Sequence, residues 1–146
     1  MTADYVPPVM LRWPEHTKPG RYNDLVSTID IVPTILTACG VDVPDNLPGL
    51  SLLDVAAGKG KLKRNAVFGE IFVHTALSLD QPALNLTHRW VREDDWKLIW
   101  PEKGKPELYN LAEDPFEEKN LASQHPEKVR HLQNIIEKWW RLRQQD

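Results

Sequence analysis

The spacing of hydrophobic positions changes along the chain and predicts short helices before residue 60. Residues 30–40 place aliphatic side chains on one helical face, with Asp30 as the expected N-cap and Gly40 as the stop. A short apolar run at 9–11 lies between prolines and predicts a buried strand. Residues 50–57 predict a second short helix. This half of the chain therefore reads as a strand followed by helices and loops.

In the second half of the chain, hydrophobic residues first alternate as in strands and then recur at helical spacing. Residues 66–72 and 107–111 predict strands, and 88–91 with 96–100 predict a hairpin around a polar turn. A C-terminal helix follows, with apolar residues at helical spacing: Val129, Leu132, Ile135, Ile136, Trp139 and Leu142. We therefore expect an α+β fold in which an antiparallel sheet of about four strands packs on this helix.

Composition narrows the class of protein without identifying it. The 146 residues are 41% hydrophobic and 27% charged, which is typical of a globular protein. The net charge of −3 offers no electrostatic footprint for nucleic acid or an anionic membrane, so we expect neither partner. No apolar run is long enough to span a bilayer, and no signal peptide is visible. Cys39 is the single cysteine, which excludes an internal disulfide, and we expect it in the core.

Candidate chemistry is sparse. The sequence has no nucleophile elbow, no paired histidines of a zinc protease and no phosphate-binding loop. Residues 74–87 have no clear period, and a long irregular loop of this kind often lines a site. Polar and aromatic residues beside this loop are candidates for a substrate-binding rim: Glu70, His74, His88, Arg89 and Trp90. The alternative is a solvated loop beside a hairpin with a salt bridge.

A series of short motifs, in order along nearly the whole chain, resembles the later part of type I sulfatases. The first motifs are VMLRWP (9–14), KPG (18–20), DIVPTIL (30–36) and LPGLSLL (47–53). The later ones are WKLI (96–99), ELYNL (107–111), Asp114-Pro115, Glu117 and Asn120-Leu121-Ala122. Each motif alone is weak, but their order and spacing together are specific.

The resemblance implies a C-terminal part of an alkaline-phosphatase-like enzyme that hydrolyses sulfate esters or sulfamates. The family uses a formylglycine, made from a Cys/Ser-x-Pro-x-Arg motif, and a divalent metal, usually calcium. Cys39 is followed by Gly-Val-Asp-Val and does not match that motif. The resemblance assigns residues 1–64 to the end of the catalytic domain and 65–146 to the small C-terminal subdomain. It places no catalytic or metal residue in this chain.

The same resemblance implies the partners of the longer enzyme. Its substrate would be a sulfated small molecule or carbohydrate, and a periplasmic, secreted or lysosomal location would fit the family. We expect the isolated chain to be inactive and to contribute scaffold and one wall of the substrate pocket. Two alternatives stay open at this point. The chain could be a non-enzymatic binding or dimerising module with exposed apolar surface, or part of a related phosphohydrolase.

Overall fold

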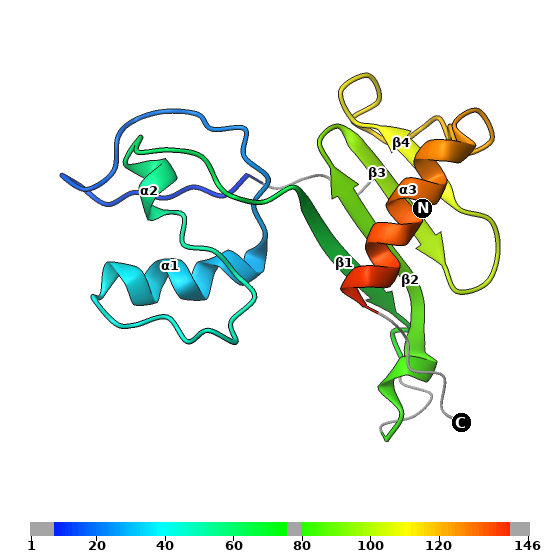
Figure 1. Cartoon of the computed structure of the whole chain (residues 1–146), viewed down its shortest axis with the longest axis horizontal. Coiled ribbons are helices and arrows are strands. Elements are labelled where there is room, and N and C mark those ends of the chain that lie inside the picture. Colours follow the sequence, from blue (N-terminus) through cyan, green and yellow to red (C-terminus); the bar gives the residue numbers. More distant parts are fainter. Residues whose placement is uncertain (1–7, 76–79, 141–146) are drawn as a thin grey trace. The chain divides into compact units, whose positions relative to one another are not determined.

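A computed structural model of the chain describes residues 8–75 and 80–140, and these residues form two compact units (Figure 1). One unit lies within Val6–Asn65, and the other runs from Ala66 onward. The assignment of 1–64 to a catalytic domain and of 65–146 to a C-terminal subdomain stays a prediction. Compactness by itself does not show to which domain of a longer protein a unit belongs.

The Val6–Asn65 unit contains three short helical elements joined by loops. A 3-10 turn, η1 (Thr28–Asp30), leads directly into α1 (Ile31–Ala38), and α2 (Leu53–Ala56) follows a loop. Gly40, with φ 69°, lies in the left-handed region just after α1 and stops the helix as predicted. The predicted helix at 50–57 is shorter than expected.

Two predictions for this unit are wrong. Residues 9–11 form no strand: Met10 is 90% exposed, and a strand needs a neighbouring strand to pair its backbone. Cys39, expected in the core, is exposed at the end of α1, where the aliphatic side chains of the helix are exposed as well. The helix instead buries Pro33 and Thr34.

The unit from Ala66 onward contains the expected sheet and helix. Strands β1 (Ala66–Phe72), β2 (Leu86–Glu93), β3 (Trp96–Pro101) and β4 (Glu107–Asn110) form a four-stranded antiparallel sheet in chain order. A 3-10 turn, η2 (Pro82–Asn85), precedes β2, and α3 (Pro126–Trp139) follows β4. Figure 1 shows α3 lying across one face of the sheet. The predicted fold class is confirmed.

The core of this unit lies between α3 and the sheet. Val91, Leu98 and Leu108 are cross-strand neighbours, and all three are fully buried against Leu132 and Ile136 of α3. The helical stripe predicted from the sequence is therefore the core face of α3. Leu142, the last member of that stripe, lies outside the described residues. No helix in the described ranges is long and apolar enough to cross a membrane.

The face of the sheet opposite α3 carries both polar and apolar side chains, and several of them are buried, among them Val67 and Ile99. Side chains alternate along a strand, so Trp90, Lys97 and Tyr109 lie on this second face. Lys97 donates to both carboxylate oxygens of Glu117, at 2.8 and 3.1 Å, and each side chain of this pair is less than a tenth exposed. Glu117 has a φ of 56°, so the loop after β4 bends sharply to bring its carboxylate to the sheet.

Candidate functional site

The five residues predicted as a polar rim lie around the β1–β2 pair, but on two faces of the sheet. Glu70 of β1 is the cross-strand partner of Arg89, and both lie on the α3 face. His88 and Trp90 flank Arg89 in β2 and therefore lie on the opposite face. His74 follows β1 and is exposed. The structure thus brings Glu70 near Arg89 and His88 near Trp90, but it does not gather all five on one surface.

Arg89 is 4% exposed and bonds to α3 and to the end of β3. Its Nε donates to Glu102 at 3.0 Å, its Nη2 lies 3.1 Å from a carboxylate oxygen of Glu137, and its Nη1 donates to the Trp140 carbonyl at 2.9 Å. Three contacts occupy the planar guanidinium in three directions. Arg89 therefore holds the C-terminal end of α3 against the sheet.

His88 is half-buried, and its neighbours assign its tautomer. The Thr87 hydroxyl donates to the Ile71 carbonyl at 2.8 Å, and its oxygen lies 3.0 Å from Nδ1 of His88. Since the single hydroxyl proton is used toward Ile71, the Thr87 oxygen accepts from Nδ1–H. A neutral His88 then carries Nε2 as its acceptor nitrogen. In this tautomer Nε2 can accept a hydrogen bond from a substrate hydroxyl.

Trp90 packs against the backbone of β1 at Gly69. An added Cβ at Gly69, its cross-strand partner, would lie 2.4 Å from the indole ring. The Lys97 ammonium lies 5.5 Å from the centroid of the same ring, within cation–π range. The indole is thus fixed between a glycine and a buried ion pair.

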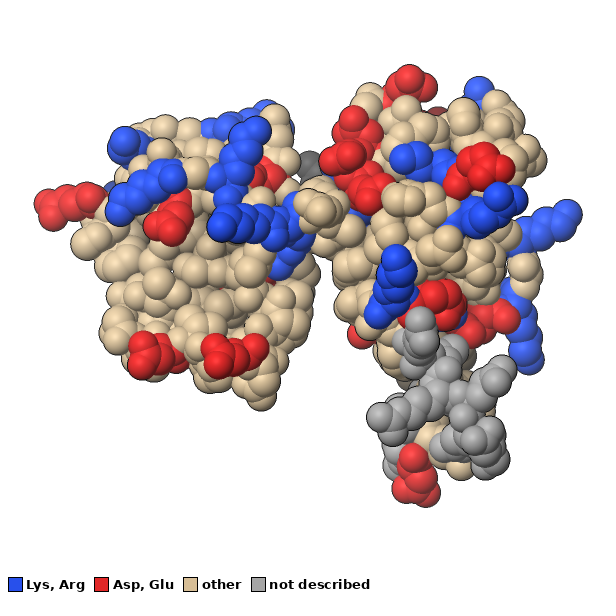
Figure 2. Space-filling view, in the orientation of Figure 1, with Lys and Arg blue, Asp and Glu red and all other residues tan. Residues whose placement is uncertain are grey.

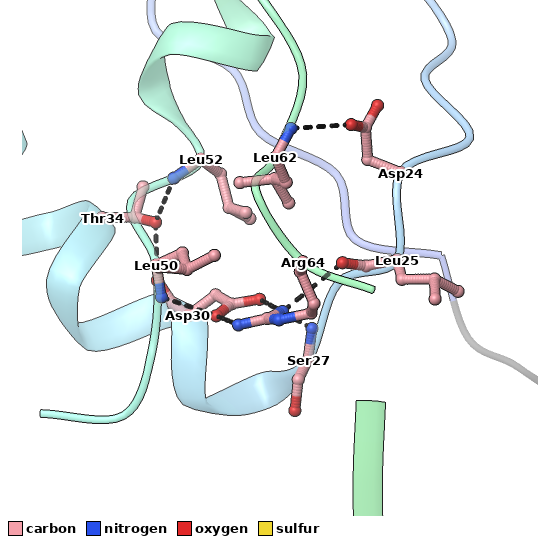
Figure 3. Close-up of polar contacts among 9 residues, drawn as sticks. All are labelled: Asp24, Leu25, Ser27, Asp30, Thr34, Leu50, Leu52, Leu62 and Arg64. Carbon is pink, nitrogen blue, oxygen red and sulfur yellow. Dashed lines mark hydrogen bonds and ion pairs between the residues drawn. The ribbon is translucent and has the colours of Figure 1, made fainter. Parts of the chain in front are cut away.

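The Val6–Asn65 unit contains a buried polar centre that the sequence prediction did not identify (Figure 3). Asp30, expected as a helix N-cap, is fully buried, and Arg64 contacts it with two nitrogens, at 2.5 and 2.6 Å. The backbone amides of Ser27 and Leu50 donate to the same carboxylate, each at 2.8 Å. Asp30 therefore joins three separate segments of this unit.

These bonds determine the charge state of Asp30. Burial by itself would raise the pKa of Asp30, because it disfavours the charged carboxylate. The Arg64 guanidinium and the amides of Leu50 and Ser27 outweigh burial, and the pKa lies below the ordinary value of 3.8. Asp30 is thus a permanently charged structural group at neutral pH, and all of its bonds are to this unit.

A shallow depression of about 170 Å³ also lies in the Val6–Asn65 unit. Trp13 and His16 line it with their rings stacked, 3.9 Å between centroids, and Asp54 and Lys59 contribute one charge of each sign. Its small volume falls below the range of ordinary ligand pockets, roughly 300–1,000 Å³. We therefore assign it no ligand.

The residues of this chain do not fit the metal or the formylglycine that the family implies. Within residues 8–75 and 80–140, no three His, Cys, Asp or Glu side chains are grouped to hold a metal ion. Cys39, the single cysteine, is exposed at the end of α1 and lacks the Pro and Arg of the modification motif. No chemical step through either group can be placed on these residues.

Together, the described residues form a four-stranded antiparallel sheet covered by a helix, and a separate helical unit, each with a buried ion pair. The chain belongs to the family described as N-sulphoglucosamine sulphohydrolase, C-terminal, whose model matches residues 3–145. This confirms the resemblance to type I sulfatases inferred from the ordered motifs.

Sulfatases from distant organisms match most of the chain. The N-acetylgalactosamine-6-O-sulfatase of Bacteroides thetaiotaomicron is 30% identical over 145 residues, which cover 89% of this chain and 26% of the relative. Arylsulfatase K of Bos taurus is 30% identical over 129 residues, which cover 86% and 24%. The chain thus spans about a quarter of the length of these relatives.

Solved structures agree with the fold. A 2-O glycosaminoglycan sulfatase matches with a TM-score of 0.65 and 25% identity, over 75% of this chain and 23% of that one. A protein bound to its substrate D-glucosamine-2-N,6-O-disulfate matches with a TM-score of 0.59 and 27% identity, over the same shares. The phosphonate monoester hydrolase of Silicibacter pomeroyi reaches a TM-score of 0.72 over 88% of this chain and 27% of that one, but at 23% identity this shows the fold alone.

Proposed function

We propose that this chain acts as the C-terminal portion of a sulfatase that hydrolyses sulfate esters or sulfamates of carbohydrates. The observation that carries the proposal is the family match over residues 3–145, together with relatives that act on sulfated sugars by name. The chain is about a quarter of such an enzyme in length. Its part in the reaction is to complete the fold and to supply one wall of the substrate pocket.

The reactive groups in this proposal come from the rest of the enzyme. A formylglycine would supply the nucleophile for sulfate transfer, and calcium would stabilise the charge on the sulfate oxygens. The described residues of this chain fit neither group. The proposal therefore gives these residues binding and positioning tasks only.

The pocket wall in this proposal is the end of the β1–β2 pair. His88 presents its Nε2 as an acceptor and is suited to bind a substrate hydroxyl, and His74 is an exposed side chain beside it in the sequence prediction of the rim. Trp90 offers a half-buried indole on the same face as His88, whereas Glu70 is exposed on the α3 face and would border the wall from the other side of the sheet. Arg89 is a positioning residue, because its bonds to Glu102, Glu137 and Trp140 fix β2, the strand that carries His88 and Trp90.

An aryl-sulfate assay with added calcium tests the proposal. We expect no turnover by the isolated chain and turnover by a polypeptide in which the chain follows its catalytic part. In that active form, His74→Ala and His88→Ala should raise KM several-fold, with Lys103→Ala, an exposed residue outside the wall, as the control. Turnover by the isolated chain above the buffer background would refute the assignment of the chemistry to the rest of the enzyme.

The second candidate is a dimerising module without enzymatic function. The exposed aliphatic residues of α1 favour it, because such surface promotes association. Measuring the size of the chain in solution separates the two candidates: a monomer at micromolar concentration counts against the dimer.

A third candidate is that the chain is part of a related phosphohydrolase. The phosphonate hydrolase similarity is at the level of fold, and the sulphohydrolase family match favours the sulfatase.

A further inference from the structure

The segment that ends the Val6–Asn65 unit presents a row of lysines to solvent. Four of the six residues 59–64 are basic, a density typical of surfaces that bind polyanions. Lys59, Lys61 and Lys63 are exposed, whereas Leu62 and Arg64 are partly buried. This alternation is that of an extended chain, which turns every second side chain to the same side. The three lysines therefore lie in a row that spans up to about 14 Å between its outer Cα atoms.

Contacts on the inner side anchor this segment to the unit. The Leu62 amide donates to a carboxylate oxygen of Asp24 at 2.8 Å, and Arg64 forms its ion pair with the buried Asp30. Figure 3 shows both contacts. The row is thus presented by an anchored segment rather than by a free tail, so less backbone freedom is lost when a ligand binds it.

A fourth lysine lies beside the row on a separate segment. The Lys18 amide donates to the Ala56 carbonyl at 2.8 Å, and a Cβ added at Gly58 would lie 3.9 Å from the Lys18 ammonium nitrogen. Lys18 is exposed and therefore stands next to the start of the row. We name Lys18, Lys59, Lys61 and Lys63 the basic surface. Figure 2 shows blue atoms gathered over α2 and the segment that follows it.

The charges of the basic surface are not neutralised within the unit. In residues 8–75 and 80–140, none of its four ammonium groups lies within ion-pair distance of a carboxylate. Asp54 shares the shallow depression with Lys59, and Asp24 is bonded to the Leu62 amide. The net charge of the whole chain, −3, hides this local excess of positive charge. An anion that bridges several of these lysines would relieve their mutual repulsion.

We infer that the basic surface binds the chain of a sulfated polysaccharide, so that the enzyme holds its substrate at a second site besides its pocket. This inference rests on the proposed function. Sulfate groups carry a permanent negative charge at neutral pH, and a row of cations can meet several of them along one chain. A single sugar ring is shorter than the distance from Lys59 to Lys63, so the basic surface favours a polymer over a monosaccharide.

The comparisons favour a sulfated sugar over another polyanion. A nucleic acid also carries regularly spaced negative charges, but a relative and a similar solved structure are named for sulfated sugars, N-acetylgalactosamine-6-O-sulfate and a glycosaminoglycan. The proposed pocket wall lies at the end of the β1–β2 pair, on the other unit. The basic surface is therefore a site separate from that wall.

Titration of a labelled heparin octasaccharide with the chain, followed by fluorescence anisotropy at about 50 mM NaCl, tests the inference. The triple variant Lys59→Gln, Lys61→Gln and Lys63→Gln should weaken binding at least about tenfold, because it removes three charges and keeps side chains of polar character. For the unchanged chain, raising the salt to about 200 mM should also weaken binding at least about tenfold, since bound counterions are released on association.

The matched control removes the same charge from the other unit. Lys103→Gln, Lys105→Gln and Lys119→Gln change three exposed lysines there. Both triple variants should keep the circular dichroism of the unchanged chain, because every substituted side chain is exposed. The control should alter the dissociation constant by less than about twofold, since distant charges are screened by salt.

Four results on the free chain would overturn the inference. They are no binding of the octasaccharide at low salt, equal weakening by the two triple variants, equal affinity for an octasaccharide stripped of its sulfates, and tighter binding of a DNA duplex of matched charge. The titration is then repeated on a longer polypeptide in which this chain follows its catalytic part. Equal binding by the two triple variants there would overturn the inference as well, because the basic surface would then be covered.

The aryl-sulfate assay separates this inference from the proposed function. Octasaccharide binding that depends on the basic surface, in a longer polypeptide without turnover, supports the inference and contradicts the proposed function. Turnover by that polypeptide, with equal octasaccharide binding by the two triple variants, does the reverse.

Discussion

At the scale of single residues, the polar members of the sulfatase motifs are structural. Asp30 belongs to the DIVPTIL motif and is the buried centre of Figure 3. Lys97 and Glu117 come from two separate motifs and form one buried ion pair. Asn120, from another, accepts from the amides of Leu108 and Ala122 with its side-chain oxygen. The motifs therefore identify the family through groups that hold the fold together.

The pairing of Asp30 with Arg64 predicts a large loss of stability when one partner is removed. Asp30→Asn should lower the free energy of unfolding by about 3–5 kcal/mol, because it leaves the Arg64 charge buried without its partner. Asp30→Asn with Arg64→Leu should cost less than the sum of the two single changes, since neither charge is then unpaired. Urea unfolding measures both, with the exposed Asp45→Asn as control. A cost for Asp30→Asn within about 0.5 kcal/mol of that control would contradict the prediction.

At the scale of elements, the strand pairing depends on one glycine. Gly69 and Trp90 face each other across β1 and β2, and the indole occupies the space of the missing side chain. The period of two in the sequence predicts both strands, and their pairing and register follow from burying Phe68 with Val91 on the α3 face. Which residue opposes Gly69 emerges only from that register.

Adding one methyl group at position 69 tests this close packing. Gly69→Ala should lower the free energy of unfolding by about 1–3 kcal/mol, because the new Cβ overlaps the indole. Trp90→Leu removes the ring, so in that background the added cost of Gly69→Ala should be much smaller. The four proteins form a double-mutant cycle measured by urea unfolding. Equal costs for Gly69→Ala with and without Trp90 would show that the ring is not the cause.

At the scale of the whole molecule, each unit contains a carboxylate with a lowered pKa. In the Val6–Asn65 unit this is Asp30. In the other unit it is Asp114, whose pKa is lowered by bonds from the amides of Glu118 and Lys119. A carboxyl group whose pKa is lower in the folded state stabilises the fold fully above its unfolded value, and this stabilisation is lost as the pH falls through the folded value. Both units therefore contribute to acid sensitivity.

The chain should accordingly lose stability below the ordinary aspartate pKa of 3.8. The unfolded state then binds protons more readily than the folded state, so acid favours unfolding. The stability difference between wild type and Asp30→Asn should shrink as the pH falls from neutral to about 3, because Asp30 of the wild type then binds a proton more readily in the unfolded state than in the folded state. Unfolding curves across this range measure the difference. A difference that stays constant down to the acid end would rule out a role for Asp30 in acid sensitivity.

The local hydrophobic pattern predicted the core correctly where the apolar face of an element is also the face that the fold buries. The period of two in β1–β4 and the helical stripe of α3 each predict one apolar face, and the core of Val91, Leu98, Leu108, Leu132 and Ile136 is built from those faces. It failed at Cys39, which was expected in the core but is exposed beside the aliphatic side chains of α1. The helix orientation there is decided by hydrogen bonds of Thr34 and Asp30 to distant segments, which no local period encodes.

For the candidate rim, the sequence by itself placed Glu70, His74, His88, Arg89 and Trp90 near one end of a strand pair. It determined the family as well, through ordered motifs, and the α+β fold, through periodicity. The tertiary structure alone decided that Arg89 faces α3 while His88 and Trp90 face away, because pleating alternates side chains and register assigns each its neighbour. It alone also showed that Asp30 is a buried partner of Arg64, because residues 34 positions apart meet only when the chain folds.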